Sequence, residues 1–262
     1  KYMSNCSYDF KNRPLVSVVM NCFNGETYLK EAIDSVFSQT YTNWEIIFWD
    51  NRSDDGSSRI AKSYGEKLIY FKASKRTPLH EARNLALDKC QGEAIAFLDV
   101  DDIWLPEKLE KQISIFSNKN RIIYGGYEDI DKNGDRTGAV QENCPSGFLT
   151  SQLLLKNKIS QGSVLIDASL LREYKFDERY HIIGDFDLWV RLSLSYEFKS
   201  VSGTVELSRQ HDTNESNTQR YKWLSERRYF YRKFLRSQSL FKYPRIIIYI
   251  LMAELKGLIN LR

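Results

Sequence analysis

Residues 92–102 read GEAIAFLDVDD, in which the apolar run Ala94–Leu98 leads directly into Asp99, Asp101 and Asp102. A short apolar run of this kind is typical of a buried strand. Three carboxylates within four residues repel one another unless a cation or hydrogen-bond donors lie among them, and hard divalent cations prefer oxygen ligands. The stretch therefore predicts a buried strand that ends at a candidate metal site, with capping of the following helix as the alternative.

From Pro14 to about Asp102, short β-branched runs alternate with helical stretches. This alternation predicts an α/β fold with a doubly wound, mostly parallel, Rossmann-like sheet, in which ligands bind beyond the carboxyl ends of the strands. The predicted strands are Val16–Cys22, Glu45–Asp50, Lys67–Lys72 and Ala94–Asp99, and the predicted helices are Thr27–Ser38, Ser57–Tyr64, Leu79–Lys89 and Glu107–Phe116.

Downstream, the Asn133-Gly134 pair within Asp129–Gly138 is a strong turn signal, and it predicts a hairpin or an excursion from the sheet. The remaining predicted elements are strands at Arg121–Tyr127, Gly162–Asp167 and Thr204–Arg209, a helix at Asp185–Ser195, and mostly helical chain from Tyr221 with a break at Pro244.

Polar loops follow the first two predicted strands. Phe23 and Asn24 come after the first strand, and the loop Asp50–Ser57 begins at the end of the second. A carboxylate at a strand end can accept the imide N–H of a uracil, and small polar residues leave room for a base and a ribose. The same residue types are ordinary turn formers, and Asp55 or Ser57 would make a good helix cap. Taken alone, the two loops leave nucleotide binding and plain turn chemistry both open.

Several stretches, taken in order, resemble the family 2 inverting glycosyltransferases, which have the GT-A fold. The resemblance extends from about Leu15 to Asn217. It rests on the strand Ser17–Met20 with Phe23-Asn24, the loop Asp50–Ser57, the segment Ala82–Ala86, the stretch 92–102, the acceptor-side motif Gly184–Leu192 and the late metal-site segment Arg209–His211. The motifs together are far more specific than any one of them.

The resemblance implies a donor site, a metal site and a general base. The donor-binding residues are Phe23, Asn24, Asp50, Arg83, Asp99 and Asp101, with Asp50 on the base and Asp99 on the ribose or sugar. The ligands of Mn²⁺ or Mg²⁺ on the diphosphate are Asp101 and His211. The base that deprotonates the acceptor is Asp185, which we expect to stay ionised because it would lie at the positive end of a helix.

Simpler roles remain open for several of these residues. Arg83 could form a surface salt bridge, His211 could be a solvated loop residue, and Asp185 could merely cap its helix. Many family members carry Glu-Asp where this chain has Gly184-Asp185, so the supporting acid is missing. Asp187 is the rival base, although two residues later on a helix its side chain would face elsewhere.

The activity that follows is a metal-dependent, inverting transfer of a sugar from a nucleoside-diphosphate donor, expected to be a UDP-sugar. The acceptor would be a hydroxyl of a glycan or lipid-linked saccharide in bacterial polysaccharide biosynthesis. One alternative is a polyprenyl-phosphate acceptor, which is already ionised and needs no base. Another is a catalytically silent protein that binds sugar nucleotides or glycans. The chain lacks the Walker, G-x-G-x-x-G, H-E-x-x-H and G-x-S-x-G motifs of kinase-like enzymes, dehydrogenases, zinc proteases and serine hydrolases.

The chain changes character near its end. The net charge is +4, yet residues 221–262 hold ten Lys and Arg against two Glu, which leaves −4 for residues 1–220. Aromatic residues interleaved with these charges are typical of an interfacial membrane helix. A helix that packs its aromatic face on the catalytic domain is the main alternative. Nucleic-acid binding is a third, which the lack of a nucleic-acid module disfavours.

These observations divide the chain into an N-terminal extension at 1–13, a GT-A domain at 14–217 and a basic helical tail at 218–262. The nucleotide-binding half is expected at 14–102 and the acceptor-binding half at 103–217. A hydrophobic content of 42% suffices for a sizeable core. No signal peptide, no apolar run of the ~20 residues that cross a bilayer and no C-x-x-C pair is visible. We therefore expect a cytoplasmic protein that can associate with the inner face of the cell membrane.

Overall fold

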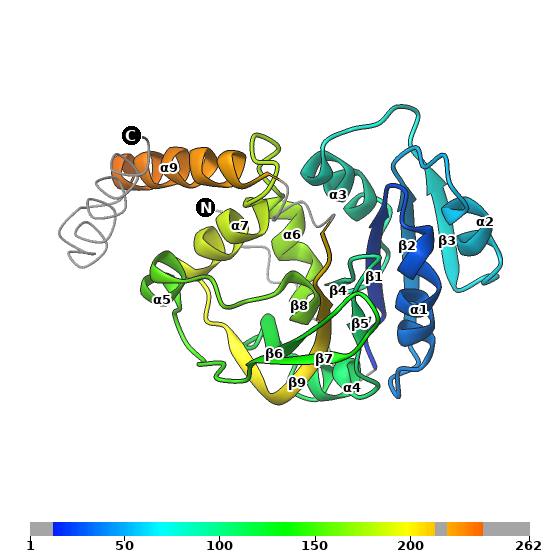
Figure 1. The fold of residues 1–262 in the computed structure, drawn as a ribbon. Coiled ribbons are helices and arrows are strands. Elements are labelled where there is room, and N and C mark those ends of the chain that lie inside the picture. Colours follow the sequence, from blue (N-terminus) through cyan, green and yellow to red (C-terminus); the bar gives the residue numbers. More distant parts are fainter. Residues whose placement is uncertain (1–12, 213–218, 238–262) are drawn as a thin grey trace.

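The computed structural model describes residues 13–212 and 219–237, in which helices cover a nine-stranded sheet (Figure 1). The strands are β1 (Val16–Cys22), β2 (Trp44–Asp50), β3 (Leu68–Lys72), β4 (Ala94–Phe97), β5 (Ile103–Trp104), β6 (Ile122–Ile130), β7 (Arg136–Gln141), β8 (Val164–Asp167) and β9 (Lys199–Arg209). The helices are α1 (Glu26–Phe37), α2 (Ser57–Lys62), α3 (Leu79–Leu87), α4 (Lys108–Ile113), α5 (Thr150–Leu155), the 3₁₀ turn η1 (Gln161–Ser163), α6 (Ala168–Tyr174), α7 (Gly184–Ser193) and α9 (Arg220–Ser237).

The strands follow the order β3-β2-β1-β4-β8-β6-β9-β5, and β7 pairs with β6 outside this path. The first half, β3-β2-β1-β4, is parallel, whereas β8 lies antiparallel between β4 and β6. Helices α1, α2 and α3 are the crossovers between the parallel strands, a connection that such strands require. The predicted α/β class with a largely parallel, doubly wound sheet is confirmed.

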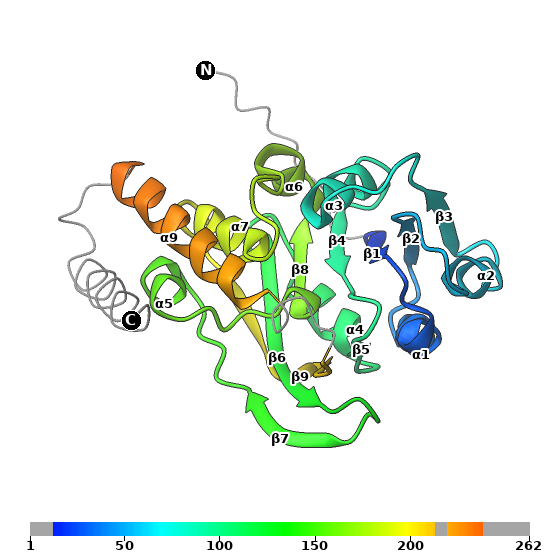
Figure 2. The ribbon, with the colours of Figure 1, turned by 45° about the horizontal axis from the view of Figure 1, so that its top comes forward.

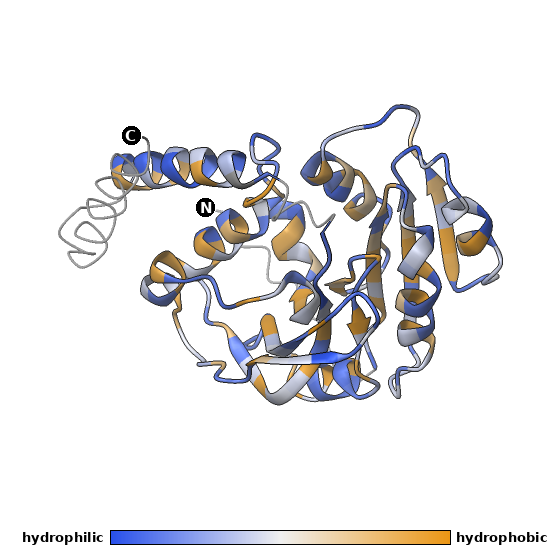
Figure 3. Cartoon of the chain, viewed as in Figure 1, coloured by the Kyte–Doolittle hydropathy of each residue, from blue (hydrophilic) through white to orange (hydrophobic). Residues whose placement is uncertain are grey.

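Alternate residues of the central strands face opposite sides of the sheet, and each side has its own core. Val18 and Met20 of β1 pack on one side with apolar residues of α1 and α4. Val19 packs on the other side with residues of α3, α5, α6, α7 and α9. Helices cover both faces, so β1, β2 and β4 are buried over nearly their whole length, and they appear as hydrophobic segments in Figure 3. This burial explains their continuous apolar runs.

Some elements differ from the sequence prediction in their bounds. Strand β4 ends at Phe97, before the predicted end at Asp99, because the chain turns there and the Asp102 N–H donates to the Asp99 carbonyl oxygen (3.2 Å). Strand β9 begins at Lys199 rather than at the predicted Thr204. Its first residues are mostly half-buried and lack an apolar pattern, so the sequence does not predict this part of the strand. The sequence pattern does not predict β5, α5 or α6, because two to seven residues are too few to show a period.

Strands β6 and β7 form the hairpin that Asn133-Gly134 predicts. The Gly134 N–H donates to the Asp131 carbonyl oxygen (3.0 Å), and the Asp131 carboxylate accepts the N–H groups of Asn133 and Asp135. Gly134 has a φ of 92°, a left-handed conformation that glycine adopts without strain. Figure 2 shows β7 at the outer edge of the molecule, whereas β6 pairs with β8 and β9 inside the sheet.

Helix α9 packs on the domain through an aromatic face. Phe230, Tyr231 and Phe234 are buried in the core that also contains α7, and the rings of Phe186 and Phe230 lie 4.8 Å apart. Figures 1 and 2 both show α9 alongside α7. Within the described ranges, no helix has both the length and the apolar character needed to cross a bilayer. The predicted break at Pro244 and the predicted boundary at 217/218 lie outside the described residues.

Candidate active site

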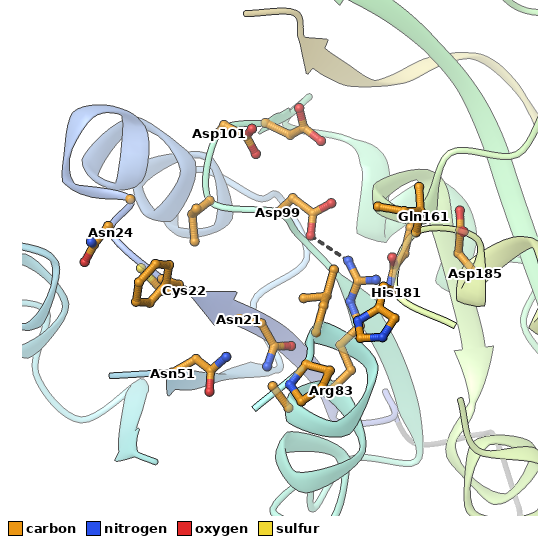
Figure 4. A pocket seen from close by; sticks show the side chains of 18 of the residues that line it. Asn21, Cys22, Asn24, Asn51, Arg83, Asp99, Asp101, Gln161, His181 and Asp185 are labelled. Carbon is orange, nitrogen blue, oxygen red and sulfur yellow. Dashed lines mark hydrogen bonds and ion pairs between the residues drawn. The ribbon is translucent and has the colours of Figure 1, made fainter. Parts of the chain in front are cut away.

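A cavity of about 1010 Å³ opens beyond the carboxyl ends of β1, β2 and β4, where an open α/β sheet is expected to bind its ligand. Figure 4 shows side chains that line it. Its walls come from both halves of the chain. The first half contributes the loops at the strand ends and α3, and the second contributes η1, the start of α7, the end of β9 and the first residues of α9. The cavity is large enough for a ligand of the size of a nucleotide sugar.

The three carboxylates that follow β4 have three different partners. None of them caps α4, whose N-cap residue is Glu107 and which has no side-chain cap bond. The partners are the Arg83 guanidinium for Asp99 (2.9 Å), the His211 ring for Asp101 (2.9 Å) and the Arg209 backbone N–H for Asp102 (2.7 Å). Each of the three carboxylates thus has a partner of its own, but the charge of Asp99 still raises the pKa of Asp101.

Arg83 and Asp99 form a one-sided ion pair. The Arg83 side chain on α3 is 5% exposed, whereas the Asp99 side chain is 45% exposed. The Arg83 guanidinium therefore holds Asp99 Oδ1 in place, while the rest of the Asp99 carboxylate stays accessible from the cavity. The alternative of a surface salt bridge for Arg83 is wrong, because its guanidinium is buried at the base of the pocket.

Asp101 and His211 come together although 110 residues separate them, with 2.9 Å between Asp101 Oδ2 and His211 Nε2. The end of β9 approaches the loop after β4, and the Arg209 Nε–H donates to the Asp101 carbonyl oxygen (2.9 Å). His211 lines the pocket, and its ring lies tilted against the Tyr28 ring with 5.4 Å between the ring centroids, so it is not a solvated loop residue. Burial, with the Asp99 charge next, raises the pKa of Asp101.

This pair fits a divalent cation. An aspartate carboxylate and an imidazole are a common donor set for Mn²⁺, and a nearby cation would offset the repulsion between Asp99 and Asp101 that raises the pKa of Asp101. Over residues 13–212 and 219–237, no three His, Cys, Asp or Glu side chains gather as ligands of one ion. Within these ranges Asp101 and His211 are thus a pair that could ligate an ion, and donor phosphate oxygens are the kind of ligand that completes such a shell.

Asp102 belongs to a different environment. Its carboxyl group is buried, and burial, with the charge of Glu206 next, raises its pKa well above the usual range. Glu206 on β9 is also buried and accepts a hydrogen bond from Ser160 Oγ (2.9 Å). A raised pKa favours the protonated form of a carboxyl group. Asp102 therefore contributes less negative charge to the pocket than an ordinary aspartate would.

Phe23 and Asn24 lie in the pocket wall after β1, as the resemblance implies. Asn24 has a φ of 54°, a region that asparagine tolerates better than most residues, and its N–H donates to Ser53 Oγ (3.1 Å). The Phe23 ring is 39% exposed, and the Arg76 guanidinium carbon lies 3.6 Å from its centroid. An aromatic face and a cation thus lie side by side at the rim.

Asp50 does not line the pocket. It is fully buried, accepts the Ser53 N–H (2.7 Å) and accepts a very short hydrogen bond from the Tyr70 hydroxyl. Burial and this bond raise the pKa of Tyr70 to about 12, so the phenol remains a donor to the carboxylate. Both carboxylate oxygens of Asp50 thus have a partner inside the protein, and the next residue, Asn51, is the one that reaches the cavity.

Asp185 lies in the first turn of α7 and lines the pocket (Figure 4). It is not the cap of this helix, because the N-cap residue is Ile183 and no side chain caps the end. Burial raises the pKa of Asp185, against the expectation that its helix position alone keeps it ionised. The rival Asp187 is buried in the core and pairs with Arg191 (2.7 Å), so it faces away from the pocket.

Several pocket residues carry no recognisable signal in the sequence. Asn51 is the exception, because it lies in the polar loop Asp50–Ser57 that follows β2. The others reach the cavity from loops or from α9, where only the fold brings them close; they include Arg76, Gln161, His181, Gln219 and Lys222.

Known proteins share this sequence pattern. Residues 17–183 match Glycosyl transferase family 2. An uncharacterized glycosyltransferase of Rickettsia bellii is 37% identical over 192 residues, which are 68% of this chain and 27% of that protein. The matches to three rickettsial relatives cover only 27% to 31% of their length. The UDP-Glc:alpha-D-GlcNAc-diphosphoundecaprenol beta-1,3-glucosyltransferase WfgD of Escherichia coli is 34% identical over 181 residues, 68% of this chain and 69% of the relative.

The fold is shared with solved glycosyltransferases. The mannosyltransferase PcManGT of Pyrobaculum calidifontis, solved with GDP-Man and Mn²⁺, is similar with a TM-score of 0.63 and 16% identity, over 94% of this chain and 70% of that chain. This likeness confirms the predicted GT-A fold. Because the family match covers more than half of the chain and relatives exceed 30% identity, the chain belongs to glycosyl transferase family 2.

Proposed function

We propose that the chain transfers a sugar from a UDP-sugar to a hydroxyl of a glycan or lipid-linked acceptor, with inversion at the anomeric carbon. The observation that carries the proposal is that one cavity collects Arg83, Asp99 and Asp101 from the nucleotide-binding half and Asp185 from the acceptor-binding half. The name of the E. coli relative specifies UDP-Glc and a diphosphoundecaprenol-linked acceptor, which supports a role in bacterial polysaccharide biosynthesis.

Asp185 would act as the general base. An alcohol is a poor nucleophile at neutral pH, and a carboxylate within reach of its proton contributes roughly 10²–10⁴-fold in rate. The raised pKa makes Asp185 a stronger base than an ordinary aspartate once it is ionised. It would accept the proton of the acceptor hydroxyl as the oxygen attacks the anomeric carbon from the face opposite the nucleotide.

The donor would lie against the residues at the strand ends. Phe23 and Asn24 would hold the nucleoside, Arg83 would orient Asp99, and Asp99 would accept hydrogen bonds from the ribose or sugar. Asp50 would reach the base only after release from Tyr70. Asp101 and His211 would hold Mn²⁺ or Mg²⁺, which when bound neutralises the charge that develops on the departing diphosphate.

The first experiment is titration calorimetry of UDP with Mn²⁺ and with EDTA. We expect UDP to bind only with the metal, because the diphosphate otherwise meets the Asp99 and Asp101 charges. In Asp101→Ala the affinity with Mn²⁺ should fall to the value measured with EDTA, while the exposed control Asp135→Ala should bind like the wild type. Equal affinity with and without EDTA would refute the metal site.

Product analysis separates the alternatives. A polyprenyl-phosphate acceptor is already ionised, so an enzyme of that kind should keep its turnover in Asp185→Asn. A silent binding protein should bind UDP with Mn²⁺ but release no UDP from a UDP-sugar with any acceptor. The position of Asp185 in the cavity supports an acceptor that must lose a proton, and NMR of the product would show whether the anomeric configuration inverts.

A peripheral membrane contact is proposed for the face of α9 that points away from the domain. This face, here called the basic face, consists of the half-buried Arg228 and the exposed Arg232 and Arg236. Tyr221 and Leu224, exposed on the same helix, add apolar contact area. Each basic side chain near an anionic membrane contributes about 1 kcal/mol. The opposite face packs on the core, so packing and membrane contact use different faces of the tail.

A further inference from the structure

Glu226 on α9 makes an unusual set of contacts for an acidic residue of a basic helix. Its side chain is buried, and its carboxylate accepts three consecutive backbone N–H groups, from His181 (2.8 Å), Ile182 (2.9 Å) and Ile183 (3.2 Å). A carboxylate that accepts two or three backbone N–H groups forms strong, charge-assisted bonds. Glu226 therefore holds one short loop, 181–183, in a single backbone conformation.

This loop is the start of α7, the helix that carries Asp185. A helix begins with N–H groups that have no intrahelical acceptor, and they need partners from elsewhere. The first backbone bond of α7 runs from the Asp187 N–H to the Ile183 carbonyl oxygen (2.9 Å). The Ile183 N–H before it goes to Glu226, and the Gly184 N–H goes to Nε2 of the buried His80 (3.1 Å). Both acceptors come from distant parts of the chain.

The anchor of Glu226 is firm. On the same helix, Phe230, Tyr231 and Phe234 are buried in the core beside α7, and the Tyr231 hydroxyl donates to the Leu154 carbonyl oxygen (2.7 Å). Figures 1 and 2 both show α9 next to α7. The position of the Glu226 carboxylate is thus set by core packing rather than by the loop that it holds.

The loop held by Glu226 also forms part of the catalytic cavity. His181 and Ile182 line the cavity together with Asp185. Gln219, which precedes α9, and Lys222 on α9 line it as well. A shift of the loop would therefore move both the acceptor-side wall and the carboxylate that is proposed as base.

We propose that Glu226 is a positioning residue for sugar transfer: it fixes residues 181–183 and thereby holds Asp185 at the acceptor. The proposal rests on the proposed function, since it assumes that Asp185 is the base. The helical tail then completes the active site rather than only attaching the protein to a surface. A misplacement of about 1 Å in a reacting group costs about 10²-fold in rate, so this contact is expected to act on turnover.

The main test compares Glu226→Gln with the wild type and with Glu173→Gln, an exposed glutamate on α6 that undergoes the same chemical change. The Gln variant keeps one acceptor oxygen and loses the charge. We expect its kcat to fall at least about tenfold with UDP and Mn²⁺ affinity within about twofold. Amide hydrogen exchange at 181–183 should be faster in Glu226→Gln than in the wild type. Glu226→Asp should recover part of kcat only if it also slows this exchange.

The pH profile adds a readout that overall stability does not move. Burial raises the pKa of Asp185, so a loosened loop that admits water should lower this pKa and shift the acidic limb of kcat/KM to lower pH. Glu173→Gln should leave the limb unchanged.

The outcomes are distinct. A Gln variant with wild-type kcat, or one whose UDP affinity and kcat fall together with the melting temperature, would overturn the positioning role. If Glu226→Ala does not fold, the Gln and Asp variants still decide the question. A wild-type protein that transfers no sugar to any acceptor refutes the proposed function itself, and the positioning role falls with it.

Discussion

Asp185→Asn is the change that tests the reaction most directly. Asn has nearly the same shape as Asp and suits the first turn of a helix, but it cannot accept the proton of an acceptor hydroxyl. If Asp185 is the base, kcat should fall by roughly 10²–10⁴-fold, which corresponds to about 2.7–5.5 kcal/mol in the activation barrier. Affinity for UDP and Mn²⁺ should not change, because their proposed ligands lie on other elements.

The expected effect of Asp185→Asn on the stability of the fold is small. Burial raises the folded-state pKa of Asp185, so the folded protein binds this proton more tightly than the unfolded chain does. Ionisation above that pKa therefore costs stability, and stability is lost as the pH rises from the unfolded pKa towards the folded one. Asn cannot ionise, so the variant avoids this cost. It also lacks the negative charge at the start of the helix, and the loss of that charge costs only about 0.3–1 kcal/mol of stability. The variant should thus be about as stable as the wild type at neutral pH.

The pH profile follows from the same shift. The base must be deprotonated, so kcat/KM of the wild type should fall as the pH drops through the raised pKa of Asp185. The limb should lie above the ordinary aspartate value of about 3.9. The residual activity of Asp185→Asn should lack it.

The assay is release of UDP with a saccharide acceptor, beside a urea melt of each variant. The matched control is Asp187→Asn in the same helix, which breaks the buried pair with Arg191 and should lower stability without changing kcat of the folded enzyme. Near-normal turnover of Asp185→Asn would refute the assignment of the base. A parallel loss of kcat in Asp187→Asn would show that the helix, rather than the carboxylate, matters.

Two further predictions concern packing and the tail. Gly184→Ala should destabilise the fold by about 1–3 kcal/mol in urea denaturation, because a Cβ at this position would lie 2.3 Å from His80 Nε2. In the double variant, His80→Ala should remove most of this cost. Replacement of the three Arg residues of the basic face of α9 by Gln should weaken binding to anionic vesicles by about 3 kcal/mol, or roughly 10²-fold, in a flotation assay. Replacement of three exposed basic residues on α1 and α2 should have little effect, and equal binding by the two variants would refute the membrane contact.

The sequence determined what depends on neighbours along the chain. The run Ala94–Leu98 is apolar because β4 is covered on both faces, and the carboxylates after it stand at a strand end whatever the rest of the chain does. The Asn133-Gly134 turn is set by local backbone preference. These features have short range, so a pattern of a few residues was enough to predict the parallel half of the sheet and the location of the site.

The orientation of the site residues and the partners that hold them depend on how distant helices and strands pack together. Asp50 and Asp99 are both carboxylates at or near strand ends. Asp50 is buried and bonded to the Tyr70 hydroxyl, whereas Asp99 pairs with Arg83 and stays accessible from the cavity. The hydrogen bond that the Ile183 N–H donates to the Glu226 carboxylate joins residues 43 positions apart. No local pattern encodes such pairs, because each depends on how whole helices pack: α9 reaches the start of α7 only because its aromatic face is buried in the same core.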